Sequence, residues 1–436
     1  MEIISSADKL LIQLLGKQKK ISDSAVRPLK WTLKLSVDEG FIIHNFLTGE
    51  CLFFENETDI TAGSEYMYSR YFFVPEDNDD IKLAEELRLA VRLIDRKKEI
   101  TSYKILTTTD CNARCFYCYE AGMKRENMST DTADALVDYI RKKSCGKKIT
   151  LSWFGGEPLL NKRVIDHICS ELRKSGIEYT SVMTSNGYLF TPETIKIAKE
   201  KWNLKNIQIT LDGTRDVYNR IKAYIDAVDD PFERVMENIK MLTDHKIRVN
   251  IRLNMNPDNY EDLLSLADEL SKRFKEKEYL SVYASGLFQD THDETDDKKR
   301  KDVFIKLGYL SGYLHDIGLS KSDKKSLKLR VRSCMADGDS HRGISPAGKL
   351  MKCEHHIFDK LTGDIFEDHE DANALEKWKT KLPYDDICKD CFALPACYKL
   401  FNCPVSHICT EDEKKQYKVS MIDKVKDQYK KFRESF

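Results

Sequence analysis

The sequence has almost no net charge and no long apolar run. Its 71 Lys and Arg residues offset 72 Asp and Glu residues, which leaves a formal net charge of −1 at pH 7. This balance does not favour nucleic acid or an anionic membrane surface as a partner. No apolar stretch approaches the ~18 residues of a membrane-spanning helix, and MEIISSADKLLIQLLGKQKK is not a charged-then-apolar leader. We therefore expect a soluble, cytoplasmic protein with no membrane or nucleic-acid partner.

Cysteine is scarce outside two segments. Of 13 cysteines, three lie within residues 111–118 and seven within residues 334–409. The other three, Cys51, Cys145 and Cys169, are expected to pack as small apolar side chains or to have no role. At 436 residues, of which 41% are hydrophobic, the chain is long enough for two to three folded domains.

Residues 101–316 repeat a strand-then-helix pattern six times. The apolar, β-branched runs KILTTT, ITLSWFGG, YTSVMTSN, IQITLDG, RVNIRLNMN and YLSVYAS each precede a helical stretch. This alternation predicts an α/β fold with a parallel sheet and right-handed crossovers, and six units make three quarters of a (β/α)8 barrel. Ligands of such barrels collect at the carboxyl ends of the strands.

Three cysteines follow the first of these strands. Cys111, Cys115 and Cys118 have the spacing C-x3-C-x2-C on a loop at the carboxyl end of the run SYKILTTT. Thiolates this close in sequence can ligate three irons of a [4Fe–4S] cluster and leave the fourth iron open to a substrate or cofactor. The alternatives are a zinc site or a disulfide, but structural zinc normally takes four ligands and prefers paired C-x2-C spacing.

The loop resembles the signature of the radical S-adenosylmethionine (SAM) superfamily, C-x3-C-x-aromatic-C, with Tyr117 at the aromatic position. The resemblance implies a partial (β/α)6 barrel that is open on one side to a large substrate. It also implies that SAM binds the open iron through its amine and carboxylate. One electron from the cluster, supplied by a donor such as flavodoxin or ferredoxin, would cleave SAM to methionine and a 5′-deoxyadenosyl radical that abstracts a hydrogen atom.

A glycine-rich turn follows the second strand. Gly155 and Gly156 allow the backbone to approach a ligand, and the turn carbonyls or the Glu157 carboxylate can accept hydrogen bonds from an ammonium group. Together with Pro158, this turn resembles the GGEP motif that holds the SAM amine in the superfamily.

Three further residues are candidates for SAM binding. Thr210, which opens the segment TLDG, and Arg220 resemble the hydroxyl and arginine that hold the SAM carboxylate in related enzymes with extra clusters. An arginine fork suits a carboxylate, although Arg220 could equally be a surface arginine. Arg252, on the fifth strand, would reach the same pocket if its side chain points inward.

Seven cysteines mark the C-terminal region. Their order, C-x13-G-x4-C followed by C-x2-C-x5-C, resembles the SPASM domain, which binds two auxiliary [4Fe–4S] clusters. The resemblance implies one complete cluster on Cys388, Cys391, Cys397 and Cys409, and a second on Cys334, Cys353 and Cys403 with a vacancy for a substrate thiolate. The five residues between Cys397 and Cys403 depart from the usual three, which puts the number of clusters in question. One or two zinc sites are the alternative to these clusters. At the vacancy of the second cluster, His341, His355 and His356 are alternative fourth ligands.

Glu354 directly follows Cys353. Sulfatase-maturating members of the superfamily use an aspartate as a base, so we predict Glu354 as a catalytic base, with a solvated surface carboxylate as the alternative.

The first hundred residues differ in pattern from the rest. After a short helical lead-in, residues 30–57 predict strand, turn, strand, with the reversal at Thr48-Gly49-Glu50, and helical stretches flank them. The layout resembles the winged-helix element in which a leader peptide adds a strand to a sheet edge, and the alternative is a structural cap. The predicted domains are therefore 1–100 for peptide recognition, 101–316 for the barrel, 317–333 as a linker and 334–436 for the auxiliary clusters with a closing helix.

Together these features predict a radical SAM maturase of a ribosomally made precursor peptide that installs a crosslink, foremost a cysteine thioether. Carbon–carbon crosslinking is one alternative, and anaerobic sulfatase maturation, which makes formylglycine, is another. A zinc- or cluster-bearing binding protein without catalysis is a third hypothesis, and it predicts no cleavage of SAM.

Overall fold

The computed structural model describes residues 1–16, 25–94, 99–287, 297–320, 327–331, 334–379, 386–397 and 409–435. The chain divides into two compact units. Unit 1 contains residues 1–96, 324–337 and 379–436, and unit 2 contains residues 97–323 and 338–378.

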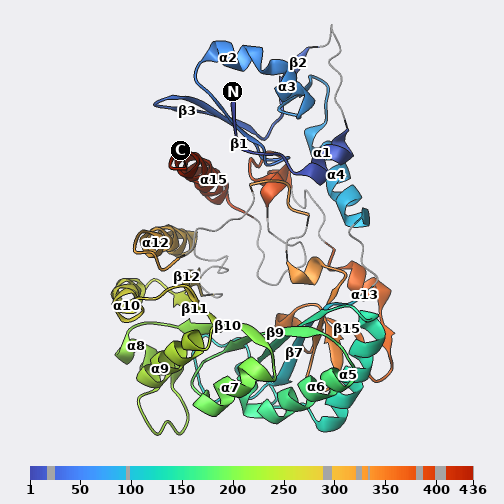
Figure 1. Ribbon diagram of the computed structural model, residues 1–436, viewed down its shortest axis with the longest axis vertical. Coiled ribbons are helices and arrows are strands. Elements are labelled where there is room, and N and C mark those ends of the chain that lie inside the picture. Colours follow the sequence, from blue (N-terminus) through green and yellow to red (C-terminus); the bar gives the residue numbers. More distant parts are fainter. Residues whose placement is uncertain are drawn as a thin grey trace. The chain divides into compact units, whose positions relative to one another are not determined.

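Unit 2 contains a parallel sheet of six strands in the order β12-β11-β10-β9-β8-β7, which confirms the predicted α/β fold class. Helices follow the strands along the outer side of the sheet (Figure 1). The elements are β7 (Ser102–Thr108), α5 (Thr130–Ser144), β8 (Ile149–Gly155), η1 (Pro158–Asn161), α6 (Lys162–Lys174), β9 (Tyr179–Ser185), α7 (Pro192–Glu200), β10 (Leu204–Leu211), α8 (Arg215–Lys222), α9 (Pro231–Asp244), β11 (Arg248–Met255), α10 (Tyr260–Arg273), β12 (Leu280–Gly286) and α12 (Asp297–Asp316).

The two faces of this sheet differ in polarity. One face is apolar and buried beneath the helices, with Leu151, Trp153, Ile207 and Ile251 in the main core. On the other face, alternate residues of β9, β10 and β11 are partly exposed and mostly polar, for example Thr184, Gln208 and Asn250. Since successive side chains of a strand point to opposite faces, the sheet presents a polar inner face opposite its helix-covered side.

Four short strands extend the sheet beyond β7. Strand β13 (His341–Ile344) pairs in parallel with β7, and β14 (Lys349–Met351), β15 (Leu361–Asp364) and β16 (His369–Glu370) follow in antiparallel order. Helix η3 (Glu354–His356) and helix α13 (Ala372–Glu376) belong to the same segment. Residues 338–378 therefore join the predicted barrel unit, which differs from the predicted single domain over 334–436.

A buried ion pair fastens this extension. Arg342 on β13 donates from Nε and Nη2 to Glu370 Oε2 on β16, at 3.1 and 2.6 Å. The Glu370 carboxylate also accepts a hydrogen bond from the Tyr139 hydroxyl of α5. The Arg342 side chain is only 8% exposed, so the pair is shielded from solvent.

Unit 1 contains an antiparallel sheet in the order β1-β5-β4-β3, with a small second sheet of β2 and β6. Strand β1 precedes the first helix, and residues 30–57 contain three strands rather than the predicted two, because the chain also reverses between Val37 and Gly40. The elements are β1 (Glu2–Ser5), α1 (Lys9–Leu15), β2 (Val26–Pro28), β3 (Thr32–Val37), β4 (Gly40–Asn45), β5 (Cys51–Phe54), α2 (Glu57–Ala62), α3 (Ser64–Ser69), β6 (Phe73–Pro75) and α4 (Asp80–Ile94).

The C-terminal part of the chain packs onto this sheet. It contributes η2 (Met335–Asp337), α14 (Asp386–Lys389), η4 (Leu394–Ala396) and α15 (Glu411–Arg433) to unit 1. The buried Trp31 donates from Nε1 to the Cys391 carbonyl at 3.3 Å, and Tyr429 of α15 stacks on Phe53 of β5. A capping box of Thr410 and Glu413 starts α15. Among the described residues, no helix has the length and apolar character needed to cross a membrane.

The Arg342–Glu370 pair generates a stability prediction. Arg342→Met leaves the Glu370 carboxylate largely buried without its cation, and should lower the free energy of unfolding by about 3 kcal/mol. Arg248→Met, at an exposed position at the start of β11, should lower it by less than about 0.5 kcal/mol. Denaturant unfolding followed by circular dichroism measures both values, and equal effects would contradict the expected cost of leaving the Glu370 carboxylate unpaired.

Candidate cluster and cofactor site

The loop of three cysteines leaves the carboxyl end of β7, as predicted. The Thr109 hydroxyl donates to the Lys124 carbonyl at 2.7 Å, which closes the base of the loop. Within the loop, Cys118 N donates to the Cys115 carbonyl at 3.1 Å, and Ala113 N donates to Cys111 Sγ at 3.4 Å. All three thiols are free and partly exposed. Backbone donors to sulfur are one way in which proteins tune iron–sulfur clusters.

The glycine turn after β8 lies directly against this loop. Gly156 N donates to the Thr108 carbonyl at 3.1 Å, and Glu157 N donates to the Asp110 carbonyl at 2.9 Å. A Cβ atom on Gly155 would lie 2.0 Å from the Thr108 carbonyl oxygen, and one on Gly156 would lie 2.3 Å from the Asp110 carbonyl oxygen. Gly155 also has a φ of +129°, which side-chain-bearing residues rarely adopt. The turn therefore requires both glycines.

The Glu157 carboxylate is already engaged inside the protein. It is fully buried and accepts hydrogen bonds from Leu159 N (3.1 Å), Ser185 Oγ (3.0 Å) and Asn186 N (2.8 Å). Burial raises its pKa to about 7, despite these donors. Glu157 thus connects the end of β8 to the end of β9, and the predicted contact with an ammonium group is left to the carbonyls of the turn.

Two other segments hold the cysteine loop. Asn186, after β9, donates from Nδ2 to Asn112 Oδ1 at 2.7 Å. After α8, Ile225 N donates to the Asn112 carbonyl at 2.8 Å, while Arg114 N donates to the Lys222 carbonyl at 2.8 Å. The loop is therefore fixed by three segments, namely the turn after β8, the turn after β9 and the connection from α8 to α9.

A buried polar network lies beneath Tyr117. Its hydroxyl donates to Asp212 Oδ1 at 2.6 Å and accepts from Lys222 Nζ at 3.2 Å, and Lys222 Nζ lies 3.0 Å from Asp212 Oδ2. The side chains of Lys222 and Asp212 are 5% and 1% exposed. Burial opposes the charge on Lys222, but the adjacent Asp212 carboxylate raises its pKa well above the usual value. Tyr117 is thus held at its hydroxyl.

The strand register brings two predicted residues together. Thr210 on β10 is opposite Arg252 on β11, which in turn is opposite Tyr283 on β12, so the three share one row of the inner face. Arg252 donates from Nη2 to Ser285 Oγ at 3.0 Å, and its Nε is buried without a hydrogen-bond partner. Arg252 therefore points inward and has an unused donor.

The structure does not bring Arg220 to this row. Arg220 is exposed on α8, whereas Tyr218 and Lys222 of the same helix are buried. Residues two apart on an α-helix point roughly 200° apart, so Arg220 lies on the side of α8 away from the Tyr117 network.

Glu354 lies near the end of the cysteine loop. Its carboxylate accepts a hydrogen bond from Lys104 Nζ at 2.6 Å, and its neighbour His355 lies against Tyr119 with ring centroids 4.2 Å apart. Burial alone would raise its pKa, but the Lys104 ammonium lowers it below the ordinary glutamate value. The carboxylate is therefore ionised at neutral pH, as a proton acceptor must be.

The C-terminal cysteines fall in both units. Cys388, Cys391, Cys397 and Cys409 lie in unit 1 with Cys334, Cys353 lies in unit 2, and Cys403 lies outside the described residues. The described ones form no disulfide with one another. Electrostatic repulsion from Cys409 adds to burial in raising the pKa of Cys391.

The histidines named as alternative ligands have contacts of their own. His341 is buried and its Nδ1 lies 3.2 Å from Ser102 Oγ, while His356 Nδ1 lies 2.9 Å from Asp359. His355 packs on Tyr119.

The residues around Cys111, Cys115 and Cys118 suit an iron–sulfur cluster. Burial raises the pKa of the Cys111 thiol to about 12, and the two neighbouring cysteines add to the shift. Metal binding releases the protons of cysteine ligands, which then bind as thiolates. In the described part of the chain, no three Cys, His, Asp or Glu side chains converge on a point for a single metal ion. A cluster differs in that it distributes its thiolates over several irons.

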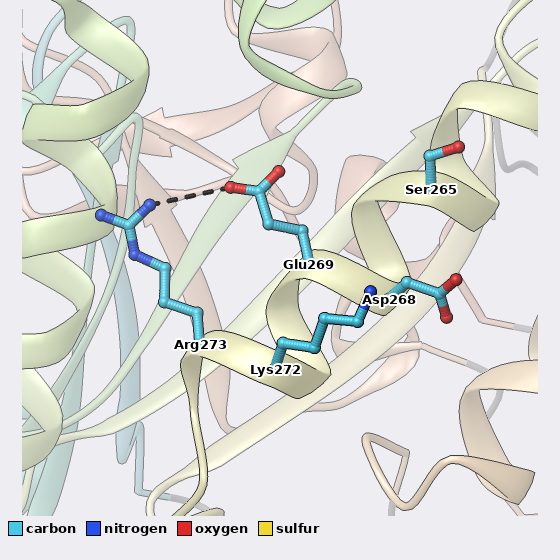
Figure 2. Close-up of a pocket in the computed structure, with 5 residues that line it drawn as sticks. All are labelled: Ser265, Asp268, Glu269, Lys272 and Arg273. Carbon is cyan, nitrogen blue, oxygen red and sulfur yellow. Dashed lines mark ion pairs between the residues drawn. The ribbon is translucent and has the colours of Figure 1, made fainter.

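A surface depression on α10 lies apart from these residues (Figure 2). Ser265, Asp268, Glu269, Lys272 and Arg273 line it. Arg273 pairs there with Glu269 at 3.7 Å and with Glu233 of α9 at 2.5 Å. The depression belongs to the helix layer and contains none of the predicted site residues.

Comparison with protein families identifies this arrangement. The family model described as the radical SAM superfamily matches residues 105–270, which run from β7 to α10 and include the cysteine loop and the glycine turn. The chain contains a radical SAM domain.

Curated relatives share this domain at low identity. The radical SAM cyclopropyl synthase TigE of Paramaledivibacter caminithermalis is 22% identical over 317 residues, which cover 67% of this chain and 65% of the relative. A probable GTP 3′,8-cyclase of Saccharolobus solfataricus is 29% identical over 299 residues, which cover 63% of this chain and 92% of the relative.

Solved structures share the fold. Native anSMEcpe with bound AdoMet and Cp18Cys peptide is 16% identical, with a TM-score of 0.56 over 75% of this chain and 99% of that chain. Streptococcus suis SuiB bound to precursor peptide SuiA is 14% identical, with a TM-score of 0.50 over 87% of this chain and 96% of that chain. At these identities the likeness establishes the fold alone.

The sequence pattern did not identify three charged residues that lie near the cysteine loop. Lys104, Glu120 and Lys222 look like ordinary charged residues of a charged chain. Both carboxylate oxygens of Glu120 are buried and accept no hydrogen bond of good geometry. Burial raises the pKa of Glu120 to about 7. Lys104 alone had a signal, since it interrupts an otherwise apolar strand.

The glycine turn of the radical SAM domain can be tested directly. Gly156→Ala places a methyl group in the space of the Asp110 carbonyl, and should displace the cysteine loop and reduce the iron bound by at least one cluster. Gly312→Ala on α12, where nothing lies within 4 Å of the added atom, is the matched control and should bind iron normally. Iron and sulfide analysis after anaerobic reconstitution gives the answer, and normal binding by Gly156→Ala would contradict the required close approach.

Proposed function

We propose that the protein is a radical SAM maturase that abstracts a hydrogen atom from a ribosomally made precursor peptide and forms a cysteine thioether. One observation carries the proposal. The loop of Cys111, Cys115 and Cys118 is fastened at the carboxyl edge of a parallel sheet whose inner face is polar and partly exposed. A cluster site beside an open polar face suits a substrate larger than a metabolite.

Different residues would hold the cluster, the amine of SAM and the carboxylate of SAM. Cys111, Cys115 and Cys118 would hold a [4Fe–4S] cluster, and the carbonyls of the turn at Gly155 and Gly156 would accept from the amine of SAM. Thr210 and Arg252, adjacent on the inner face, would bind its carboxylate, for which the buried Nε of Arg252 offers a free donor. The bound cluster and SAM would supply the carbon radical chemistry that begins with a 5′-deoxyadenosyl radical.

The comparisons and unit 1 support a peptide as the substrate. Solved SuiB holds the precursor peptide SuiA, and solved anSMEcpe holds the Cp18Cys peptide. In unit 1, strand β3 forms one edge of its sheet and pairs only with β4 within the described residues. A leader peptide that adds a strand to this edge would bind by β-augmentation.

Formation of the thioether releases one proton and one electron. The peptide cysteine loses its thiol proton, and its sulfur then joins the substrate carbon radical. That bond formation releases one electron, which an auxiliary cluster on the C-terminal cysteines would accept. Glu354, kept ionised by Lys104, would accept the proton.

Formylglycine formation is the second candidate. It is favoured by the fold shared with anSMEcpe and by the ionised Glu354, which could serve as the base. Mass spectrometry separates the two outcomes. A thioether lowers the mass of the peptide by two hydrogens without changing its heavy atoms, whereas formylglycine replaces the sulfur of a cysteine by oxygen.

The cluster assignments give a mutational prediction. Cys111→Ala, Cys115→Ala and Cys118→Ala should each abolish dithionite-driven cleavage of SAM, because each removes a ligand of the cluster that delivers the electron. Cys403→Ala should retain that cleavage but end peptide modification. Chromatography of released 5′-deoxyadenosine measures the first effect, and cleavage retained in the first set would refute the assignment. Cys145→Ala, at an exposed cysteine outside both groups, is the control.

The number of clusters gives a second prediction. Anaerobically reconstituted protein should contain about twelve iron and twelve sulfide per chain if three four-iron clusters form. About eight of each would mean that the Cys397–Cys403 spacing supports one auxiliary cluster fewer. Zinc in place of iron, with SAM untouched, would refute the proposed function.

A further inference from the structure

We propose that the buried pair Lys222 and Asp212 sets the reduction potential of the cluster held by Cys111, Cys115 and Cys118. In this assignment Lys222 favours the reduced cluster and Asp212 opposes it. The inference rests on the proposed function, because it requires a redox-active cluster at these cysteines.

The first support is the position of Lys222 relative to the loop. Its carbonyl accepts from Arg114 N at 2.8 Å, one residue before Cys115. Its ammonium donates to the Tyr117 hydroxyl at 3.2 Å, one residue before Cys118. One residue of α8 thus contacts the loop on both sides of its second cysteine.

The second support is the contact of the pair with the loop. The Lys222 ammonium interacts electrostatically with the thiols of both Cys115 and Cys118. Asp212 accepts the hydroxyl of Tyr117 at 2.6 Å and faces Lys222 at 3.0 Å. Both charges of the pair are therefore fixed at the Tyr117 hydroxyl, one residue before Cys118.

The third support is burial. Both side chains are at most 5% exposed, so water and salt screen their charges poorly. Other charges near the loop differ in this respect. Arg114 is exposed, and Arg125 is 61% exposed beside Asp110. Lys222, in contrast, is a buried cation that contacts the loop itself.

Elementary electrostatics gives the sign. A cluster with three thiolate ligands becomes more negative by one charge when it accepts an electron. A fixed cation nearby stabilises the more negative state and raises the reduction potential, and a fixed anion lowers it. Burying an ion pair costs desolvation free energy and is weak evidence for a role in stability, which favours a functional role for this one.

The experiment is a redox titration of the reconstituted holoprotein, followed by electron paramagnetic resonance. The signal of interest is the one that changes when SAM is added, which separates this cluster from auxiliary ones. The variants are Lys222→Met, Asp212→Asn and Lys222→Arg. Lys240→Met is the matched control, because Lys240 pairs with Asp244 on the surface of α9.

The variants should move the potential in opposite directions. Lys222→Met should lower it, Asp212→Asn should raise it, and both Lys222→Arg and the control should leave it near the wild-type value. A pair that merely supports the loop would instead give losses of bound iron in both neutral variants and no opposed shift. If the Lys222→Met protein binds no cluster, the direction of the potential shift in Asp212→Asn tests the proposal by itself.

Three results would overturn the inference. These are shifts of the same sign, unchanged potentials with normal iron content, and loss of the cluster in both neutral variants while the control retains it. A wild-type protein with no SAM-responsive signal would refute the proposed function itself, so the two failures are distinguishable.

Discussion

The site depends on a backbone contact that only glycine permits. Where the turn after β8 meets the loop after β7, Gly156 N and Glu157 N bond the carbonyls of Thr108 and Asp110. A side chain on either glycine would occupy the position of a carbonyl oxygen. Because the cysteine loop begins at Asp110, this contact fixes where the three thiols lie relative to the sheet. The connections after β9 and after α8 then hold the far side of the loop through Asn112 and Arg114.

The parallel register converts separate loops into one site. Six strands run in the same direction, so their carboxyl ends and the loops that follow them gather at one edge. The same register places Thr210 beside Arg252 and Arg252 beside Tyr283 on the inner face. In the described part of unit 2, helices cover the apolar face of the sheet (Figure 1), and the residues of the polar face are partly exposed.

Two buried ion pairs give this inner region its electrostatic character. Lys104 holds Glu354 ionised near the end of the cysteine loop, and Asp212 holds Lys222 charged beneath it. Each pair combines a side chain from a strand or its end with one from a later helix, α8 or η3. Each pair would be costly in a purely structural core. Such charges are retained where chemistry uses them, as in sites that transfer protons or electrons.

The sequence by itself determined the order of the strands, the cysteine loop and the glycine turn, because hydrophobic periodicity and short spacings are local properties. The α/β fold and the radical SAM domain were confirmed. Only the tertiary structure decided that β13 extends the sheet at β7, and that Arg252 points inward while Arg220 is exposed. It also decided that the Glu157 carboxylate accepts a hydrogen bond from the backbone after β9. It also decided the partners of Lys222, which lies 105 residues from Tyr117 in the chain. Pairings over such separations depend on register and helix rotation, and a single sequence contains no local signal for either.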